Sequence, residues 1–121
     1  MTESSALKIG TAFLDAWTAR DFAGAGEYLA GSFAFDGPVA HYRSAQDFLA
    51  GSKAFVERIR PAWTKVCAFG DDSEALLLYD LFFLDGTPMR IADHYTASGG
   101  KIQTETILWD THGSPFRSPP G

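Results

Sequence analysis

The stretch that decides the fold is EALLLYDLFFLDGTPMRIADHYTASGGKIQTETILWD, residues 74–110. It contains three runs rich in apolar, β-branched and aromatic residues, which are residues 74–84, 88–97 and 101–110. Asp85-Gly86, a dipeptide that favours tight hairpin turns, separates the first two runs. Ser98-Gly99-Gly100 separates the last two and indicates a second tight turn. The stretch therefore predicts an antiparallel meander of three long strands.

Three acidic residues, Asp80, Asp93 and Glu105, lie inside these apolar runs. A buried carboxylate costs free energy unless it is paired, hydrogen-bonded or protonated, so these acids are the first indication of a functional pocket. Side chains alternate along a strand, and the turn length therefore decides which acids share a face. A two-residue or a four-residue loop around Asp85-Gly86 places Asp80 and Asp93 on one face. The same face then carries Leu78, Phe82, Met89, Ile91 and Tyr95.

The second turn decides the position of Glu105. A three-residue loop at Ser98–Gly100 places Glu105 opposite Asp93, whereas a two-residue loop turns Glu105 to the other face. We prefer the three-residue loop because it groups Ile107 and Trp109, together with Gln103, on the apolar face already assigned.

The chain before the meander predicts three helices, at residues 4–19, 21–29 and 44–59, and two strands, at residues 32–36 and 62–69. In the first helix Ile9, Phe13 and Trp17 recur every four residues and form one apolar stripe. Residues 1–112 are therefore expected to form one α+β domain, in which three N-terminal helices pack on a strongly curved antiparallel sheet. Such a sheet would close into a cone-shaped barrel that encloses a pocket. Residues 113–121, with three prolines, are expected to form an irregular tail.

Composition excludes several classes of protein. The net charge of −5 and the lack of a Lys/Arg cluster argue against a nucleic-acid surface. The single cysteine, Cys67, offers neither an internal disulfide nor metal-ligand spacing. No dinucleotide fingerprint, phosphate-binding glycine loop or paired-histidine zinc motif is present, so we expect no cofactor and no metal. Without a signal peptide or a membrane-spanning apolar run, the expected location is the cytoplasm, with no membrane partner.

Several short phrases together resemble a known superfamily: Tyr28-Leu29-Ala30 leading into Phe33-Ala34-Phe35-Asp36-Gly37-Pro38, Tyr42-Arg43-Ser44, Ala92-Asp93-His94-Tyr95, Gly100-Lys101-Ile102-Gln103, and Trp109-Asp110. With them, residues 5–111 resemble the nuclear transport factor 2-like superfamily, in its SnoaL-like and ketosteroid-isomerase-like branch. The resemblance implies the same α+β barrel with a pocket. If the chain is an enzyme, it implies an isomerase like ketosteroid isomerase or a SnoaL-like cyclase.

The resemblance also implies roles for individual residues. Asp36 matches the general base of ketosteroid isomerase, and Asp93 matches the protonated aspartic acid that donates to the developing oxyanion. Asp93 is expected to be neutral at neutral pH because its mid-strand position among apolar residues disfavours the charged form, whereas Asp36, at a strand end nearer water, is expected to stay ionised. Trp109 matches a tryptophan of the pocket wall, whereas Phe13 stands where that enzyme presents a tyrosine hydroxyl. The full set of expected ligand-contacting residues is Phe13, Trp17, Tyr28, Phe33, Phe48, Ser52, Phe55, Asp80, Tyr95, Glu105 and Trp109.

The leading functional hypothesis is a pocket for a small apolar or aromatic molecule, with acid/base chemistry on a carbonyl-bearing substrate. The alternative is a non-catalytic ligand-binding or dimer-forming module whose acids are structural. Under this alternative Asp36 only begins a turn, Asp93 bonds a neighbouring His or Tyr, and Asp80 pairs with Arg90.

The opposite face of the predicted sheet carries a second apolar group, which is Leu77, Tyr79, Leu81, Phe83, Arg90, Ala92 and His94. An exposed apolar patch of this kind usually marks an interface. The sequence therefore predicts a symmetric homodimer formed through the convex sheet face, as the resemblance also implies.

Overall fold

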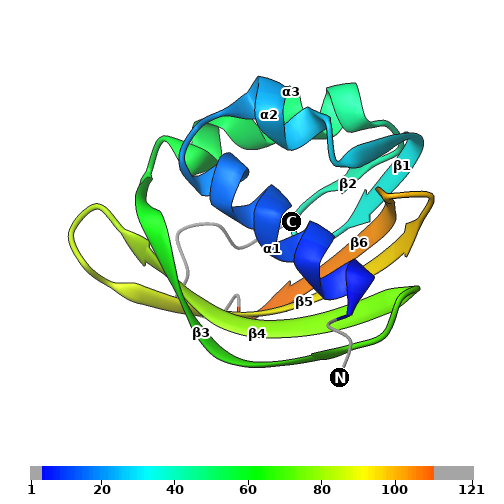
Figure 1. The fold of residues 1–121 in the computed structure, drawn as a ribbon. Coiled ribbons are helices and arrows are strands. Elements are labelled where there is room, and N and C mark those ends of the chain that lie inside the picture. The colour runs from blue at the N-terminus through cyan, green and yellow to red at the C-terminus, as the bar shows by residue number, and fades with distance from the viewer. Residues whose placement is uncertain (1–3, 111–121) are drawn as a thin grey trace.

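A computed structural model describes residues 4–110, and the expected tail at residues 113–121 lies outside this range. The described chain contains three helices, α1 (Ser5–Thr18), α2 (Phe22–Gly26) and α3 (Ala45–Val56). Its six strands are β1 (Leu29–Asp36), β2 (His41–Tyr42), β3 (Ile59–Gly70), β4 (Glu74–Phe83), β5 (Pro88–Ser98) and β6 (Lys101–Trp109). Figure 1 shows a strongly curved sheet with the helices gathered on its concave side. The predicted α+β architecture is confirmed, and β2 is an additional short strand.

Each helix begins at a residue that caps it. The Ser4 hydroxyl accepts a hydrogen bond from the Leu7 amide (3.1 Å), and the Asp21 carboxylate accepts one from the Gly24 amide (2.9 Å). The third cap, Ser44, accepts from the amide three residues further on (3.1 Å). These side chains satisfy backbone donors that have no partner inside the helix, which is why the chain turns into a helix at these points.

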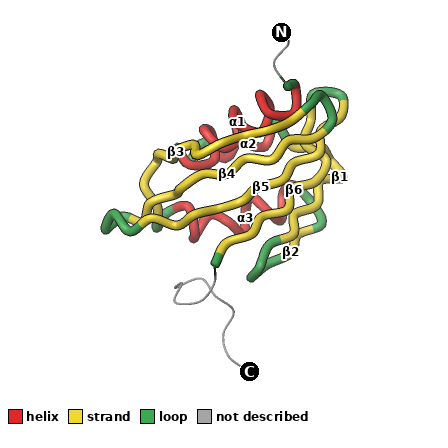
Figure 2. Tube along the Cα trace, turned by 90° about the horizontal axis from the view of Figure 1, so that it is seen from below, coloured by secondary structure: helices red, strands yellow, loops and turns green. Residues whose placement is uncertain are grey.

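The six strands form one sheet in the order β2-β1-β6-β5-β4-β3. All neighbouring strands are antiparallel except β1 and β6, which are parallel. Figure 2 shows the helices lined up behind this sheet, and α1 packs against β3, β4 and β5. The main hydrophobic core therefore lies between the helices and the concave face of the sheet.

The hairpin between β4 and β5 differs from both predicted registers. Asp80 pairs with Arg90 across the strands, and Leu77 pairs with Asp93. The Phe83 amide donates to the Thr87 carbonyl (2.9 Å), which leaves a loop of three residues, 84–86, that ends at Gly86 with a φ of 94°. A loop with an odd number of residues moves every side chain of β4 to the face opposite to the predicted one.

The expected face of Asp80 is therefore wrong. Asp80 lies on the convex face, where Arg90 donates to both of its carboxylate oxygens (2.8 and 3.0 Å). This ion pair is the one that the structural alternative predicted. Conversely, Leu77, Tyr79 and Leu81 lie on the concave face and are almost completely buried.

The hairpin between β5 and β6 places Glu105 on the expected face by a different route. Ser98 pairs with Lys101 around a two-residue turn, Gly99-Gly100, in which both glycines have positive φ (59° and 78°). Such a turn alone would send Glu105 outward. A bulge restores the alternation, because the register shifts by one residue just beyond the turn. Glu105 consequently lies on the same face as Asp93, although its direct partner is Tyr95.

The convex face is also different from the patch that the sequence predicted for a dimer, since four of its expected apolar members, all on β4, lie on the concave side: Leu77, Tyr79, Leu81 and Phe83. Its large exposed apolar side chains are instead Phe69, Leu76 and Leu108, at 70%, 45% and 62% exposure. His94 was expected on this face and lies there, paired with Glu74 at 3.0 Å.

Candidate functional site

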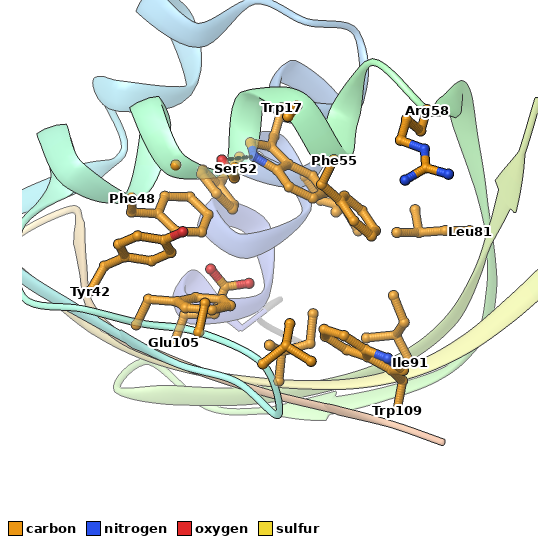
Figure 3. Close-up of a pocket in the computed structure, with 18 of the residues that line it drawn as sticks. Trp17, Tyr42, Phe48, Ser52, Phe55, Arg58, Leu81, Ile91, Glu105 and Trp109 are labelled. Atoms are coloured by element: carbon orange, nitrogen blue, oxygen red, sulfur yellow. Dashed lines mark hydrogen bonds between the residues drawn. The ribbon is translucent and has the colours of Figure 1, made fainter. Parts of the chain in front are cut away.

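A cavity of about 290 Å³ lies between the helices and the concave face of the sheet. Figure 3 shows its walls, with Trp17 and Phe55 on the helical side and Ile91 and Trp109 on the strand side. It is lined by Phe13, Leu14, Trp17, Phe35, Val39, Ala40, Tyr42, Phe48, Gly51, Ser52, Ala54, Phe55, Arg58, Tyr79, Leu81, Ile91, Glu105, Ile107 and Trp109. Most of these side chains are apolar, so the cavity suits a ligand that is mainly hydrocarbon.

Aromatic rings from α1 and α3 form the helical wall. Trp17 lies nearly parallel to both Phe48 and Phe55, with interplanar angles of 20° and 19° and ring centroids 6.3 and 5.8 Å apart. The indole N–H of Trp17 donates to the Ser52 hydroxyl (3.0 Å), and this bond fixes the orientation of the ring. These three rings therefore lie nearly parallel to one another in the helical wall.

On the strand side of the cavity, Tyr42 and Glu105 flank Phe35. In the sheet, Phe35 on β1 pairs with Tyr42 on β2 and with Glu105 on β6, and all three line the cavity. Because side chains alternate, the neighbours of the two aromatic residues along the chain, Asp36 and His41, point away from the cavity. They pair with each other at 2.5 Å on the surface.

This placement corrects the expectation that Asp36 is a pocket base. Its side chain is 63% exposed, and it is not among the residues that line the cavity. The sequence pattern placed Asp36 at a strand end beside a turn, which is right, but the side chain faces water.

Two carboxyl groups, those of Asp93 and Glu105, lie in the core on the strand side of the cavity. Both are buried, with Asp93 at 0% and Glu105 at 3% exposure. The hydroxyls of Tyr79 and Tyr95 donate to the same oxygen of Asp93, Oδ2, at 2.7 and 2.8 Å. Figure 3 shows the Glu105 carboxyl directed into the cavity, whereas Asp93 does not line it. Glu105 is therefore the acid that a ligand would meet.

Burial raises the pKa of Asp93 from 3.8 to about 6, and hydrogen bonds from Glu105, Tyr79 and Tyr95 limit this increase. Burial also raises the pKa of Glu105 well above its ordinary value, and the charge of Asp93 raises it further. The expected upward shift of the Asp93 pKa is therefore present. The contact between the two carboxyls lowers the pKa of Asp93 and raises that of Glu105, so it favours the charge on Asp93 and the proton on Glu105.

The other residues predicted to contact a ligand divide into three groups. Phe13, Trp17, Phe48, Ser52, Phe55, Glu105 and Trp109 line the cavity. Phe33 and Tyr95 are buried in the core beside it, and Tyr28 packs against that core, but these three do not line the cavity. Asp80 lies on the convex face.

Sequence reasoning missed several wall residues, among them Tyr42, Arg58 and Tyr79. Tyr79 was missed because the odd-numbered hairpin loop reversed the faces of β4. The Tyr42 position depends on β2, a two-residue strand that leaves no alternating pattern in the sequence. The Trp109 indole N–H is buried and has no hydrogen-bond acceptor within residues 4–110.

Among residues 4–110, no group of three or more His, Cys, Asp or Glu side chains is placed to hold a metal ion. No helix in the same range has the length and apolar character needed to cross a membrane.

No protein-family model and no curated protein matches the sequence, but solved structures match its fold. A protein from Kribbella flavida DSM 17836 is 30% identical and has a TM-score of 0.82, over 89% of this chain and 88% of that chain. A nuclear transport factor 2-like protein from Cytophaga hutchinsonii is 18% identical with a TM-score of 0.78, over 93% and 96% of the two chains. A member of the SnoaL-like family from Agrobacterium tumefaciens is also 18% identical, with a TM-score of 0.73 over 88% and 97%. These likenesses show that the chain has the nuclear transport factor 2-like fold.

Proposed function

We propose that this protein binds a small, mainly apolar molecule in the cavity and catalyses a proton transfer on it, of the kind that isomerases and cyclases perform on carbonyl compounds. The observation that supports this most is the carboxyl of Glu105, the one acid among the described residues in the wall of a mainly apolar cavity. A neutral carboxylic acid in an apolar site can donate a hydrogen bond to a carbonyl oxygen and exchange protons with a bound substrate.

The size of the cavity limits the ligand. The volume open to a ligand is about 290 Å³. It lies at the lower end of the range for small-molecule pockets. A compound with one or two rings fits this space, and the nearly parallel rings of Trp17 and Phe55 favour a planar one.

The polar groups of the wall indicate that the ligand carries oxygen. The Trp109 N–H has no acceptor among the described residues, and a carbonyl or hydroxyl oxygen would provide one. Buried donors without partners cost free energy, so a ligand that satisfies this one gains affinity. Tyr42 adds a hydroxyl group to the same cavity wall.

Binding is tested with two bicyclic probes that differ in one group, 2-naphthol and naphthalene. Wild-type protein should bind 2-naphthol about tenfold or more tightly than naphthalene, because only the naphthol makes a hydrogen bond at Glu105. Glu105→Gln should reduce this preference, while Glu74→Gln, a change on the outer face, should keep it. If neither probe binds at the cavity, the proposal is wrong.

Catalysis is tested with 2-tetralone, a bicyclic ketone with acidic α-hydrogens, by following hydrogen–deuterium exchange by NMR in deuterated buffer. Wild-type protein should accelerate the exchange, and Glu105→Gln should slow it on the order of a hundredfold. Binding of the probes without any acceleration of exchange would favour the non-catalytic alternative.

We also propose that two copies associate through the convex sheet face. The support is the set of exposed apolar side chains on that face, Phe69, Leu76 and Leu108. A monomer in sedimentation experiments at micromolar concentration would contradict this proposal. Location in the cytoplasm stays a prediction.

A further inference from the structure

We propose that Asp93 and Glu105 act as one proton-sharing pair, in which Glu105 touches the ligand and Asp93 stores the proton behind it. This inference rests on the proposed function, because it states how the carboxyl in the cavity wall would exchange protons. It adds a catalytic role for the pair and positioning roles for two tyrosines, Tyr79 and Tyr95.

The geometry of the two carboxyls requires a proton between them. With both groups ionised, Asp93 Oδ1 and Glu105 Oε1 are buried and have no hydrogen-bond donor among residues 4–110. Two buried carboxylates in contact would also repel each other strongly. When Glu105 is protonated, its carboxyl donates a hydrogen bond to the Asp93 carboxylate. One proton thus gives both groups a partner and removes one of the two buried charges.

The tyrosines decide which carboxyl keeps the charge. Tyr79 on β4 and Tyr95 on β5 both donate to Asp93 Oδ2, and both side chains are completely buried. Hydrogen bonds to an ionised acceptor are about twice as strong as neutral ones, so this arrangement holds the negative charge on Asp93. Tyr95 also interacts with Glu105, but Glu105 has no second tyrosine donor and therefore keeps the proton.

The surroundings of the pair contain few other charged groups. On the helical side of the cavity α1 presents Phe13 and α3 presents Phe48 and Ser52, none of which carries a charge. The strands contribute the hydroxyls of Tyr79, Tyr95 and Tyr42. Two basic side chains complete the set: Arg58, which lines the cavity, and His94, which acts on Asp93 from the other face of β5.

The proton transfer can then be written as a balanced step. The C–H bond next to the carbonyl of the ligand breaks, its electron pair forms the enolate, and its proton binds the Glu105 oxygen that faces the cavity. At the same time the proton already on Glu105 moves to Asp93, so Glu105 stays neutral and Asp93 loses its charge. Return of the proton from Asp93 through Glu105 to another carbon of the ligand completes an isomerisation, and no other reactant is consumed.

Two experiments test the pair, and the first requires no ligand. In ¹³C NMR titration of the ligand-free wild-type protein, the carboxyl carbons of Asp93 and Glu105 should both respond to one step near pH 6, the pKa of Asp93. Independent titration of the two residues near about 3.9 and 4.3, their values in peptides, would overturn the inference. This result stands whether or not the cavity binds a ligand, so it separates failure of the pair from failure of the proposed function.

The second experiment follows the exchange of 2-tetralone against pH. In wild-type protein the rate should rise through the pKa of Asp93, and Asp93→Asn should remove this rise and lower the rate on the order of a hundredfold. Tyr79→Phe should move the rise to higher pH, because Asp93 loses a donor that favours its charged form. Asp80→Asn, on the convex face, should leave the profile unchanged. A folded Asp93→Asn variant with the wild-type profile would refute the role of Asp93.

Discussion

The buried pair predicts that the protein becomes less stable as the pH rises from about 4 to about 7, which is opposite to the usual effect of an aspartate. Asp93 has a pKa of about 6 in the folded protein against an ordinary value of 3.8. The folded state therefore binds the proton more tightly than the unfolded state. The stabilisation that this provides is complete below the ordinary pKa and is lost as the pH rises through about 6.

The size of the effect follows from the two pKa values. Each pH unit between them is equivalent to about 1.4 kcal/mol, so Asp93 alone accounts for a decrease of about 3 kcal/mol in the free energy of unfolding. Glu105 adds to the decrease, because burial raises its pKa too. Asp71, Asp80 and Asp85 have lowered pKa values, so their contributions are lost only at more acidic pH and do not mask this window.

The assay is urea unfolding, followed by tryptophan fluorescence at several pH values between about 4 and 8. Wild-type protein should show the decrease, and Asp93→Asn should show a decrease smaller by about 3 kcal/mol. Contributions from groups elsewhere cancel in this difference, and Asp80→Asn serves as the matched control with the wild-type slope. A wild-type stability that is constant or increases across this range would refute the assignment of a protonated buried pair.

Two glycine substitutions test how the helices hold the site. Gly10→Ala should destabilise the protein by about 1–2 kcal/mol in urea unfolding, because the new Cβ would lie 2.9 Å from the buried ring of Tyr95, and this overpacking exceeds the gain of about 1 kcal/mol in helix propensity. An unchanged or increased stability would show that Tyr95 can move. Gly51→Ala should barely change stability but should lower the affinity for 2-naphthol several-fold, because its Cβ would contact the Tyr42 hydroxyl and displace that side chain in the cavity wall. Unchanged naphthol binding in this variant would mean that Tyr42 does not touch the ligand.

The order of the main elements and the aromatic residues of the helical cavity wall could be predicted from the sequence. The helical stripe through Phe13 and Trp17 identified one wall, since a period of 3.6 residues fixes the buried face of a helix without reference to its neighbours. The meander was equally clear, because two glycine-containing turns separate three apolar runs.

The faces of the strands were harder to predict, because they depend on single-residue details of the turns. Leu84 belongs to the first loop in the structure, whereas its apolar character suggested a strand. Because Leu84 lies in the loop, Tyr79 is on the inner face and not on the predicted outer face. For the same reason Asp80 is on the outer face and not on the predicted inner face. The bulge beyond Gly99-Gly100 also leaves no signal in the sequence. The expected face of Glu105 was right because the shorter turn and the bulge compensate each other.

The bulge in β6 limits which insertions and deletions the meander can accept during evolution. Substitutions along residues 74–109 change one side chain at a time, but the gain or loss of one codon in either hairpin would exchange the inner and outer residues of a whole strand. Such a change would bring Asp93 or Glu105 to the surface and apolar outer residues into the cavity. Only a second length change in the same strand pair could restore the alternation. Among relatives that keep this cavity, gaps of one residue in the meander should therefore occur in compensating pairs, while the loops outside it remain free to vary in length.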